Sequence, residues 1–130
     1  MDETELLRML NERYGSSYRP EGRLILQKEK LFHYSGTGTK LPYKWMGSHI
    51  AHTDLTLTIE GAQQLGTTAT RNVLTVTPQQ ATSYYDGEEL EGFEGAGAVI
   101  LRTPDLVIGP GLLEGGKVRN ILPKSRRTKI

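Results

Sequence analysis

The sequence predicts an α+β protein, and three observations carry that prediction. The first residues place leucines and a tyrosine at helical spacing behind a capping aspartate. Two short apolar runs around a polar turn then indicate a β-hairpin. From residue 48 onward, short apolar runs alternate with short helical segments and glycine-containing turns, as in a second part built mainly of strands. We therefore expect two parts, residues 1–47 and residues 48–130.

The first part is expected to begin with an amphipathic helix over residues 2–13. Asp2 is a favourable N-cap residue, and Glu5 three positions later completes a capping-box pattern. Gly15 is expected to end the helix. We interpret the helix as a packing element.

A hairpin of residues 24–26 and 31–34 should follow the helix, because its two apolar runs flank the polar residues 27–30. Residues 35–39, Ser-Gly-Thr-Gly-Thr, form a break that places the boundary between the two parts. The Tyr-Lys-Trp sequence at 43–45 fits either a half-buried strand or a surface that stacks on bases.

For the second part, the sequence predicts the order strand, helix, strand, helix, strand, strand, strand. Thr77 and Pro78 mark the start of its second helix, and residues 90–97 are expected to be a loop. Glu114-Gly115-Gly116 can supply the turn of a last hairpin. The expected segments are 48–60, 60–66, 73–76, 79–85, 98–101, 106–108 and 117–122.

Composition limits the possible functions. The 130 residues contain no cysteine, which excludes disulfides, cysteine zinc sites and cysteine nucleophiles. No apolar run is long enough to cross a bilayer, and the acidic N-terminus is unlike a secretory signal. We therefore expect a soluble cytoplasmic protein that has no contact with membranes.

Charge is unevenly distributed, although the net charge is only +1. An acidic stretch runs from Asp86 to Glu94, and from Lys117 onward the chain has bases but no acidic residue. The two blocks can form separate acidic and basic faces, or they can pair with each other. A strand at this point would hold Lys117 and Arg119 on one face.

The C-terminal sequence carries a family resemblance. Gly109-x-Gly111, followed by Gly115-Gly116-Lys-Val-Arg-Asn-Ile-Leu-Pro-Lys-Ser-Arg-Arg127, resembles the end of PUA-like domains. It is most similar to those appended to Sun/Fmu-type RNA cytosine-C5 methyltransferases. The resemblance extends through Leu57–Gly66, Asn72–Val76 and Tyr84–Leu90, and so covers about the last 80 residues. It implies a PUA-like mixed β-barrel with short helices, and the helix and hairpin before it resemble a pre-PUA segment.

The resemblance also implies RNA-binding residues. In PUA-like domains, the glycine-containing loop after the first helix faces RNA, and the last strand lies near that loop. The alternatives are an ordinary helix-to-strand connection for the loop and a solvated, frayed end for the basic tail. Carried onto this sequence, the expected RNA-binding residues are Gly66, Thr68, Arg71, Lys117, Arg119, Lys124, Arg126, Arg127 and Lys129.

Neither a metal site nor a catalytic site is expected. His49 and His52 are three residues apart, and in an extended segment that spacing places them on opposite faces. Gly109-Pro110-Gly111 is not followed by a helix, so we interpret it as a bulge or bend in a strand. The related methyltransferases need a separate catalytic domain with cysteine nucleophiles and a cofactor loop. The chain alone is therefore not expected to be an enzyme or to bind a cofactor.

The sequence thus favours a stand-alone module that binds structured RNA, either ribosomal or transfer RNA. It would assist RNA modification or ribosome assembly, with an RNA methyltransferase or a ribosome-assembly factor as its partner. The alternative is a protein–protein adaptor that uses the acidic stretch or the N-terminal helix and does not contact RNA.

Overall fold

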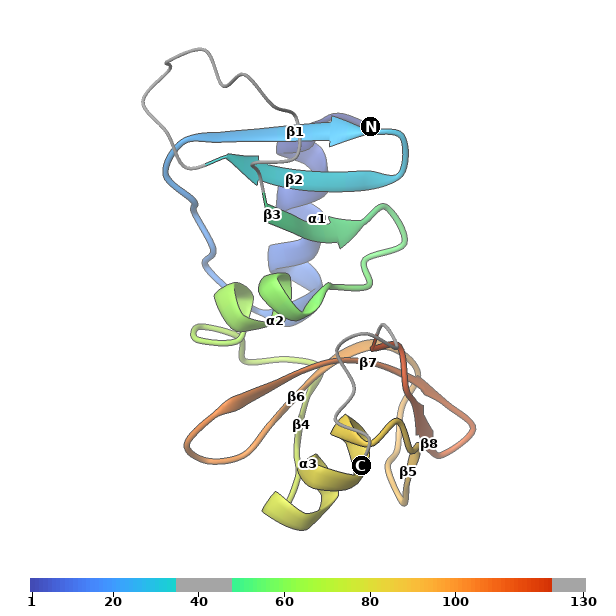
Figure 1. Cartoon of the computed structure of the whole chain (residues 1–130). Coiled ribbons are helices and arrows are strands. Elements are labelled where there is room, and N and C mark those ends of the chain that lie inside the picture. Colours follow the sequence, from blue (N-terminus) through green and yellow to red (C-terminus); the bar gives the residue numbers. More distant parts are fainter. Residues whose placement is uncertain (35–47, 123–130) are drawn as a thin grey trace.

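The computed structural model describes residues 1–34 and 48–122. Two β-sheets lie one above the other, with helix α1 beside the first sheet and helix α3 inside the curl of the second (Figure 1). The elements are α1 (Glu3–Tyr14), β1 (Arg23–Gln27), β2 (Lys30–Tyr34), β3 (Ser48–His52), α2 (Ile59–Leu65), β4 (Val73–Thr75), α3 (Pro78–Tyr85), β5 (Leu90–Glu91), β6 (Gly97–Arg102), β7 (Val107–Glu114) and β8 (Lys117–Arg119).

Helix α1 confirms the local signals at the start of the sequence. The Asp2 side chain accepts a hydrogen bond of 2.8 Å from the Glu5 amide, and so satisfies one of the free amides at the helix start. Gly15 adopts a left-handed conformation with φ 57° and ends the helix. The apolar face of the helix is buried through Leu6, Leu10 and Tyr14.

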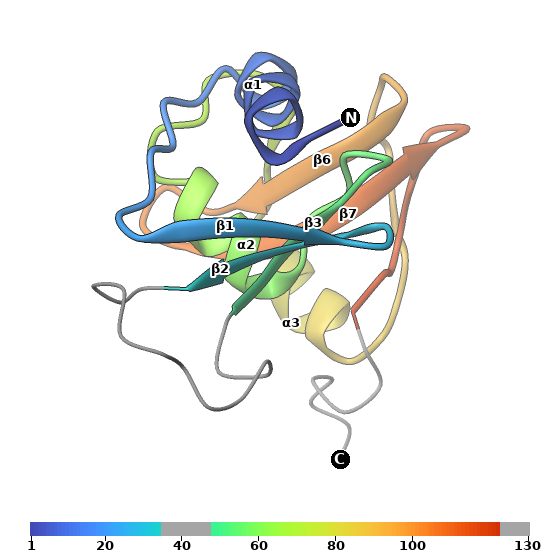
Figure 2. The ribbon, with the colours of Figure 1, turned by 90° about the horizontal axis from the view of Figure 1, so that it is seen from above.

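The first sheet has the order β1-β2-β3, with both pairs antiparallel. The expected hairpin is confirmed by β1 and β2. Strand β3, which follows residues 35–47 in sequence, pairs with β2. The division of the chain into two parts at residue 47 stays a prediction. In Figure 2, seen from above, α1 lies on one side of this sheet.

The expectation of one strand over residues 48–60 is wrong. Strand β3 ends at His52, because Leu55 takes a positive φ of 74° and turns the chain. The Asp54 carboxylate stabilises this turn by accepting from the amide and hydroxyl of Thr56, at 3.0 and 2.6 Å. After a single bridge at Leu57, the chain enters α2.

The second sheet has the order β4-β6-β7-β8-β5 and curls around α3 as a half-barrel (Figure 1). Its β4–β6 pair is parallel and its other pairs are antiparallel, so the expected α+β, PUA-like mixed fold is confirmed. The hairpin turn also follows the prediction, with φ angles of 56° and 81° at Gly115 and Gly116. Leu90 and Glu91 were expected in a loop, but they form β5 and pair with β8.

The Gly109-Pro110-Gly111 segment lies inside β7, beside an irregularity in the β6–β7 register. This confirms its interpretation as a bulged strand. Pro110 pairs only with β6, because β8 ends at Arg119, opposite Leu112. The missing amide of the proline therefore interrupts no ladder on its other side.

Strand β6 joins two hydrophobic cores. Ala98 and Ile100 contribute to the core that also contains α1, α2 and the first sheet. Val99 and Leu101 alternate with them and contribute to the core around α3. Because one strand is buried on both faces, the N-terminal elements and the second sheet are packed as one body.

Candidate nucleic-acid interface

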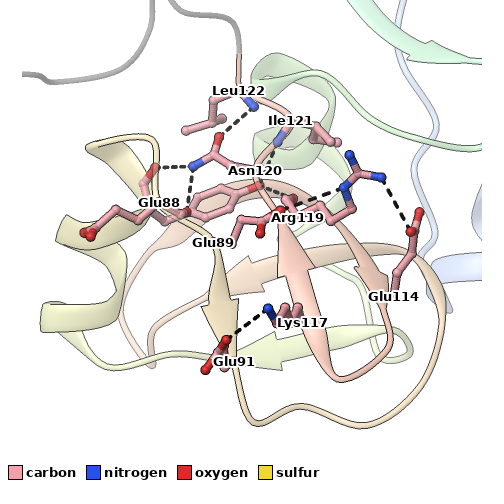
Figure 3. A network of polar contacts seen from close by, with 10 residues as sticks. Glu88, Glu89, Glu91, Glu114, Lys117, Arg119, Asn120, Ile121 and Leu122 are labelled. Atoms are coloured by element: carbon pink, nitrogen blue, oxygen red, sulfur yellow. Dashed lines mark hydrogen bonds and ion pairs between the residues drawn. The ribbon is translucent and has the colours of Figure 1, made fainter.

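The bases of β8 lie in a network of ion pairs with the acidic stretch (Figure 3). Lys117 pairs with Glu91 at 3.3 Å, and Arg119 lies 3.8 Å from Glu89 and 3.5 Å from Glu114. Of the two arrangements that the sequence allowed, the structure therefore shows pairing at this strand. Five charged groups share the patch, two bases against three carboxylates.

These ion pairs are exposed, and that limits their energy. The five side chains are between 49% and 72% exposed, so each pair contributes about 0–1 kcal/mol. An anion that reaches Lys117 or Arg119 can displace such weak partners. It must also approach the neighbouring carboxylates, which repel phosphate.

Asn120 fixes the end of β8 to the end of α3. Its side-chain amide donates to the carbonyls of Tyr84 and Glu88, at 2.6 and 3.0 Å. Its side-chain oxygen accepts from the Leu122 amide at 3.0 Å (Figure 3). The asparagine belongs to the C-terminal motif, but the sequence alone assigned it no role. The structure shows that it positions the strand and the point from which the chain continues toward its basic tail.

The loop that was expected to face RNA instead caps the C-terminus of α1. The amides of Thr70 and Arg71 both donate to the Tyr14 carbonyl at 2.9 Å. The Thr70 hydroxyl donates to the Gly15 carbonyl at 2.8 Å, and the Thr68 hydroxyl accepts from the Ser17 amide at 3.0 Å. The bonds to Tyr14 and Gly15 satisfy carbonyls at the helix end that would otherwise lack partners, and the bond to Ser17 ties the loop to the segment after the helix. The loop backbone is therefore not an open cradle for phosphate.

Gly66 has a packing role at the start of this loop. A Cβ atom at that position would lie 2.5 Å from the Ala62 carbonyl oxygen and 2.7 Å from a methyl group of Val107. Only a residue without a side chain lets the end of α2 approach β7 this closely. Gly66 is buried, which leaves Arg71 as the exposed charged group of the loop.

The structure does not bring the loop and the last strand together. Arg71 precedes β4, and β6 and β7 lie between β4 and β8 in the sheet. Three strand spacings of roughly 4.8 Å put Arg71 about 14 Å from β8 across the sheet. Contacts made by Arg71 and Arg119 would therefore fall on different parts of a bound RNA.

Arg71 instead lines an open groove of about 640 Å³ that runs along α1 from Thr4 to Gly15. Arg8 and Arg19 line the same groove, and Arg8 forms an ion pair of 2.7 Å with Glu12. Within residues 1–34 and 48–122, Arg19 and Arg71 have no ion pair. Arg19 comes from outside the motifs that the sequence analysis used, so it was missed.

Several expected contact residues lie outside the described residues. They are Lys124, Arg126, Arg127 and Lys129 of the basic tail, and the Tyr-Lys-Trp sequence at 43–45.

The expectation that His49 and His52 lie on opposite faces is wrong. Their ring centroids are 4.7 Å apart in an edge-to-face arrangement. The cause is a β-bulge, because Leu31 pairs with Ala51 while the next residue, Phe32, pairs with His49. Ile50 is thus the extra residue, and it brings the two histidines to one face. In the described part of the chain, no group of three potential ligands could hold a metal ion.

The comparisons identify the C-terminal part of the chain. Residues 71–128 match the family model of the PUA domain of the methyltransferase RsmF. The match begins at Arg71, covers just under half of the chain and includes the whole of β8. No curated protein matches the chain.

The match confirms the resemblance to a PUA-like domain of RNA methyltransferases. It is a match to the PUA domain and includes no catalytic domain. Helix α1, the first sheet and α2 precede the matched residues, although they share a core with β6. Among the described helices, none has the length and apolar character needed to cross a bilayer.

Proposed function

We propose that the protein binds structured RNA, ribosomal or transfer RNA, through its PUA domain. The observation that carries the proposal is the match of residues 71–128 to the RsmF PUA domain. PUA domains recognise folded RNA by shape and by phosphate and sugar contacts more than by base sequence. The bases at the end of the chain supply the positive charge that such contacts need.

The proposed interface has two parts, one at the C-terminal end of the chain and one at the loop before β4. Lys117 and Arg119 are held by β8, and the tail bases Lys124, Arg126, Arg127 and Lys129 follow in sequence. Arg71 lies at a distance from them on the capping loop, beside the groove with Arg19. A folded RNA presents its phosphates at fixed positions to both parts, whereas a single strand must be ordered on binding at a cost in conformational entropy. Gly66 and Thr68 support Arg71 through the packing and hydrogen bonds of that loop.

The protein would act as an accessory to RNA modification or ribosome assembly in the cytoplasm. Its partner in that role would be an RNA methyltransferase or a ribosome-assembly factor. The proposal excludes cytosine-C5 methyl transfer by the chain alone, because the 130 residues contain no cysteine nucleophile. Incubation with S-adenosylmethionine and RNA should give no methylated product, and methylation by the purified chain would contradict this part.

The structure gives less support to an adaptor that does not contact RNA. The apolar face of α1 is buried, which leaves a polar face for a protein partner. In the acidic stretch, Glu89 and Glu91 are already engaged with β8. Neither surface presents the apolar centre that stable protein interfaces have.

Fluorescence anisotropy with a labelled RNA hairpin tests the proposed function. The full chain should bind the hairpin saturably at low salt, and it should bind an unstructured RNA of the same length and composition more weakly. Equal binding of the two RNAs would contradict recognition of structure. An absence of binding to either RNA would favour the adaptor.

A further inference from the structure

A pocket of about 370 Å³ lies between the first sheet and the second, where residues of β3, α2 and β7 line it. Two imidazole rings, His49 and His52, form part of its wall. Its apolar lining includes Leu57, Pro110 and Ile121. The size, the apolar lining and the few polar groups are those of a site for a small planar molecule.

The hydrogen bonds of the two histidines define their tautomers. His49 Nε2 lies 3.2 Å from the Ala51 carbonyl oxygen, which can only accept, so Nε2 carries the proton. His52 Nδ1 lies 3.1 Å from the Thr56 hydroxyl, whose own proton is donated to Asp54. His52 Nδ1 is therefore the donor in that pair. In the neutral rings, His49 Nδ1 and His52 Nε2 are acceptors, and neither has a partner within the described residues.

His49 suits recognition in the neutral state. Burial and then the neighbouring His52 lower the pKa of His49 below its usual value, although the Ala51 carbonyl and Glu60 oppose this shift. A neutral ring keeps its acceptor nitrogen at physiological pH. Glu60 also lines the pocket, and its negative charge disfavours entry of a phosphate group.

A row of flat and apolar side chains leads to the pocket across the first sheet. Ile25 pairs with Phe32, and Phe32 pairs with His49, so the three side chains are cross-strand neighbours. The rings of Phe32 and His49 are 5.1 Å apart with an angle of 31° between their planes. Such a surface stacks on exposed bases.

We propose that this pocket holds one unpaired nucleobase of the bound RNA, and that it prefers a base with an exocyclic amino group. The two N–H bonds of an amino group complement two acceptor nitrogens, whereas uracil offers the single N3–H donor between two carbonyl acceptors, which oppose them. Ile121 on the wall is one residue before the last described residue. The lysines and arginines of the C-terminal tail, which are expected to contact phosphate, therefore follow the pocket directly in sequence. The inference rests on the proposed function and deepens it.

The test uses the full chain and RNA hairpins that carry one bulged nucleotide, either adenosine, cytidine or uridine. Adenosine and cytidine bulges should bind about fivefold or more tightly than the uridine bulge, because good polar base contacts discriminate by at least that factor. His49→Phe keeps a flat ring but removes the acceptor, and it should abolish the preference. His33→Phe is the matched control, because His33 lies in the same sheet outside the pocket and contacts the Glu21 carbonyl.

A second measurement uses the unmodified chain, so its result does not depend on whether the His49→Phe variant folds. NMR signals of the His49 and His52 rings should shift on addition of the adenosine-bulge hairpin and should remain in place with the uridine-bulge hairpin. Tight RNA binding without a base preference, or without shifts at either ring, would overturn the pocket and leave the proposed function intact. A chain that binds no RNA at low salt would overturn the proposed function itself.

Discussion

Replacement of Asn120 by alanine should destabilise the protein more than any change to the neighbouring ion pairs. The side chain makes three hydrogen bonds, to the carbonyls of Tyr84 and Glu88 and from the Leu122 amide. Each contributes about 0.5–1.5 kcal/mol net, so Asn120→Ala should lower the free energy of unfolding by about 1.5–4.5 kcal/mol. Glu88 is exposed, so water can replace part of the loss there and the lower half of this range is expected.

Urea denaturation followed by circular dichroism measures this change, with Glu91→Gln as the matched control. That control removes only the exposed pair with Lys117 and should cost less than about 1 kcal/mol. Asn120→Asp should be as harmful as alanine, because a carboxylate cannot donate to the two carbonyls. A loss below about 0.5 kcal/mol for Asn120→Ala would refute the reasoning that these hydrogen bonds hold β8 against α3.

Three further predictions concern the charged groups. Arg71→Ala should leave the melting temperature unchanged. It should weaken RNA binding by about 1–3 kcal/mol, and unequally among different RNAs, because an arginine held by the fold makes specific contacts. Equal binding of every RNA by the variant and the parent would remove Arg71 from the interface. Glu89→Gln combined with Glu91→Gln should maintain or raise RNA affinity in anisotropy titrations, because it removes the carboxylates beside Lys117 and Arg119. A large loss of RNA affinity would make the acidic stretch part of the site. The lowered pKa of His49 means that the unfolded chain binds more protons below about pH 6.5, so stability should fall as the pH drops from 7 to 5. His49→Phe should lessen that fall in urea midpoints, and an equal fall in the variant would assign the pH dependence to other groups.

Local signals predicted the elements that depend on a few neighbouring residues. The cap at Asp2, the end at Gly15 and the turn at Gly115 and Gly116 each fix backbone angles or hydrogen bonds within a few positions. The family resemblance added the PUA-like mixed β-barrel fold of the second part, which periodicity alone does not determine. It was carried by a continuous run of residues near the end of the chain.

Contacts between distant residues account for what the sequence did not predict. Strand β5 has only two residues, and it exists because Leu90 and Glu91 meet β8. The capping of α1 by Thr70 joins segments 55 residues apart. Neither contact has a local sequence signal, so the same residues were interpreted as loops.

The bulge at Ile50 shows the same limit at the candidate site. A single extra residue reverses the face on which later side chains lie, and no local pattern marks its position. The spacing of His49 and His52 was therefore interpreted for a regular strand. The pocket that they line was not predicted for the same reason.

The salt dependence of binding to a structured RNA tests the central claim most directly. The logarithm of the association constant should fall linearly with the logarithm of the salt concentration, with a slope of roughly −0.7 to −0.9 for each phosphate contacted. Arg126→Ala combined with Arg127→Ala should flatten that slope and weaken binding of all RNAs alike, because contacts to phosphate carry no sequence information. Binding of structured RNA with no dependence on salt, or no binding at low salt, would contradict the proposal that the protein binds RNA through its PUA domain.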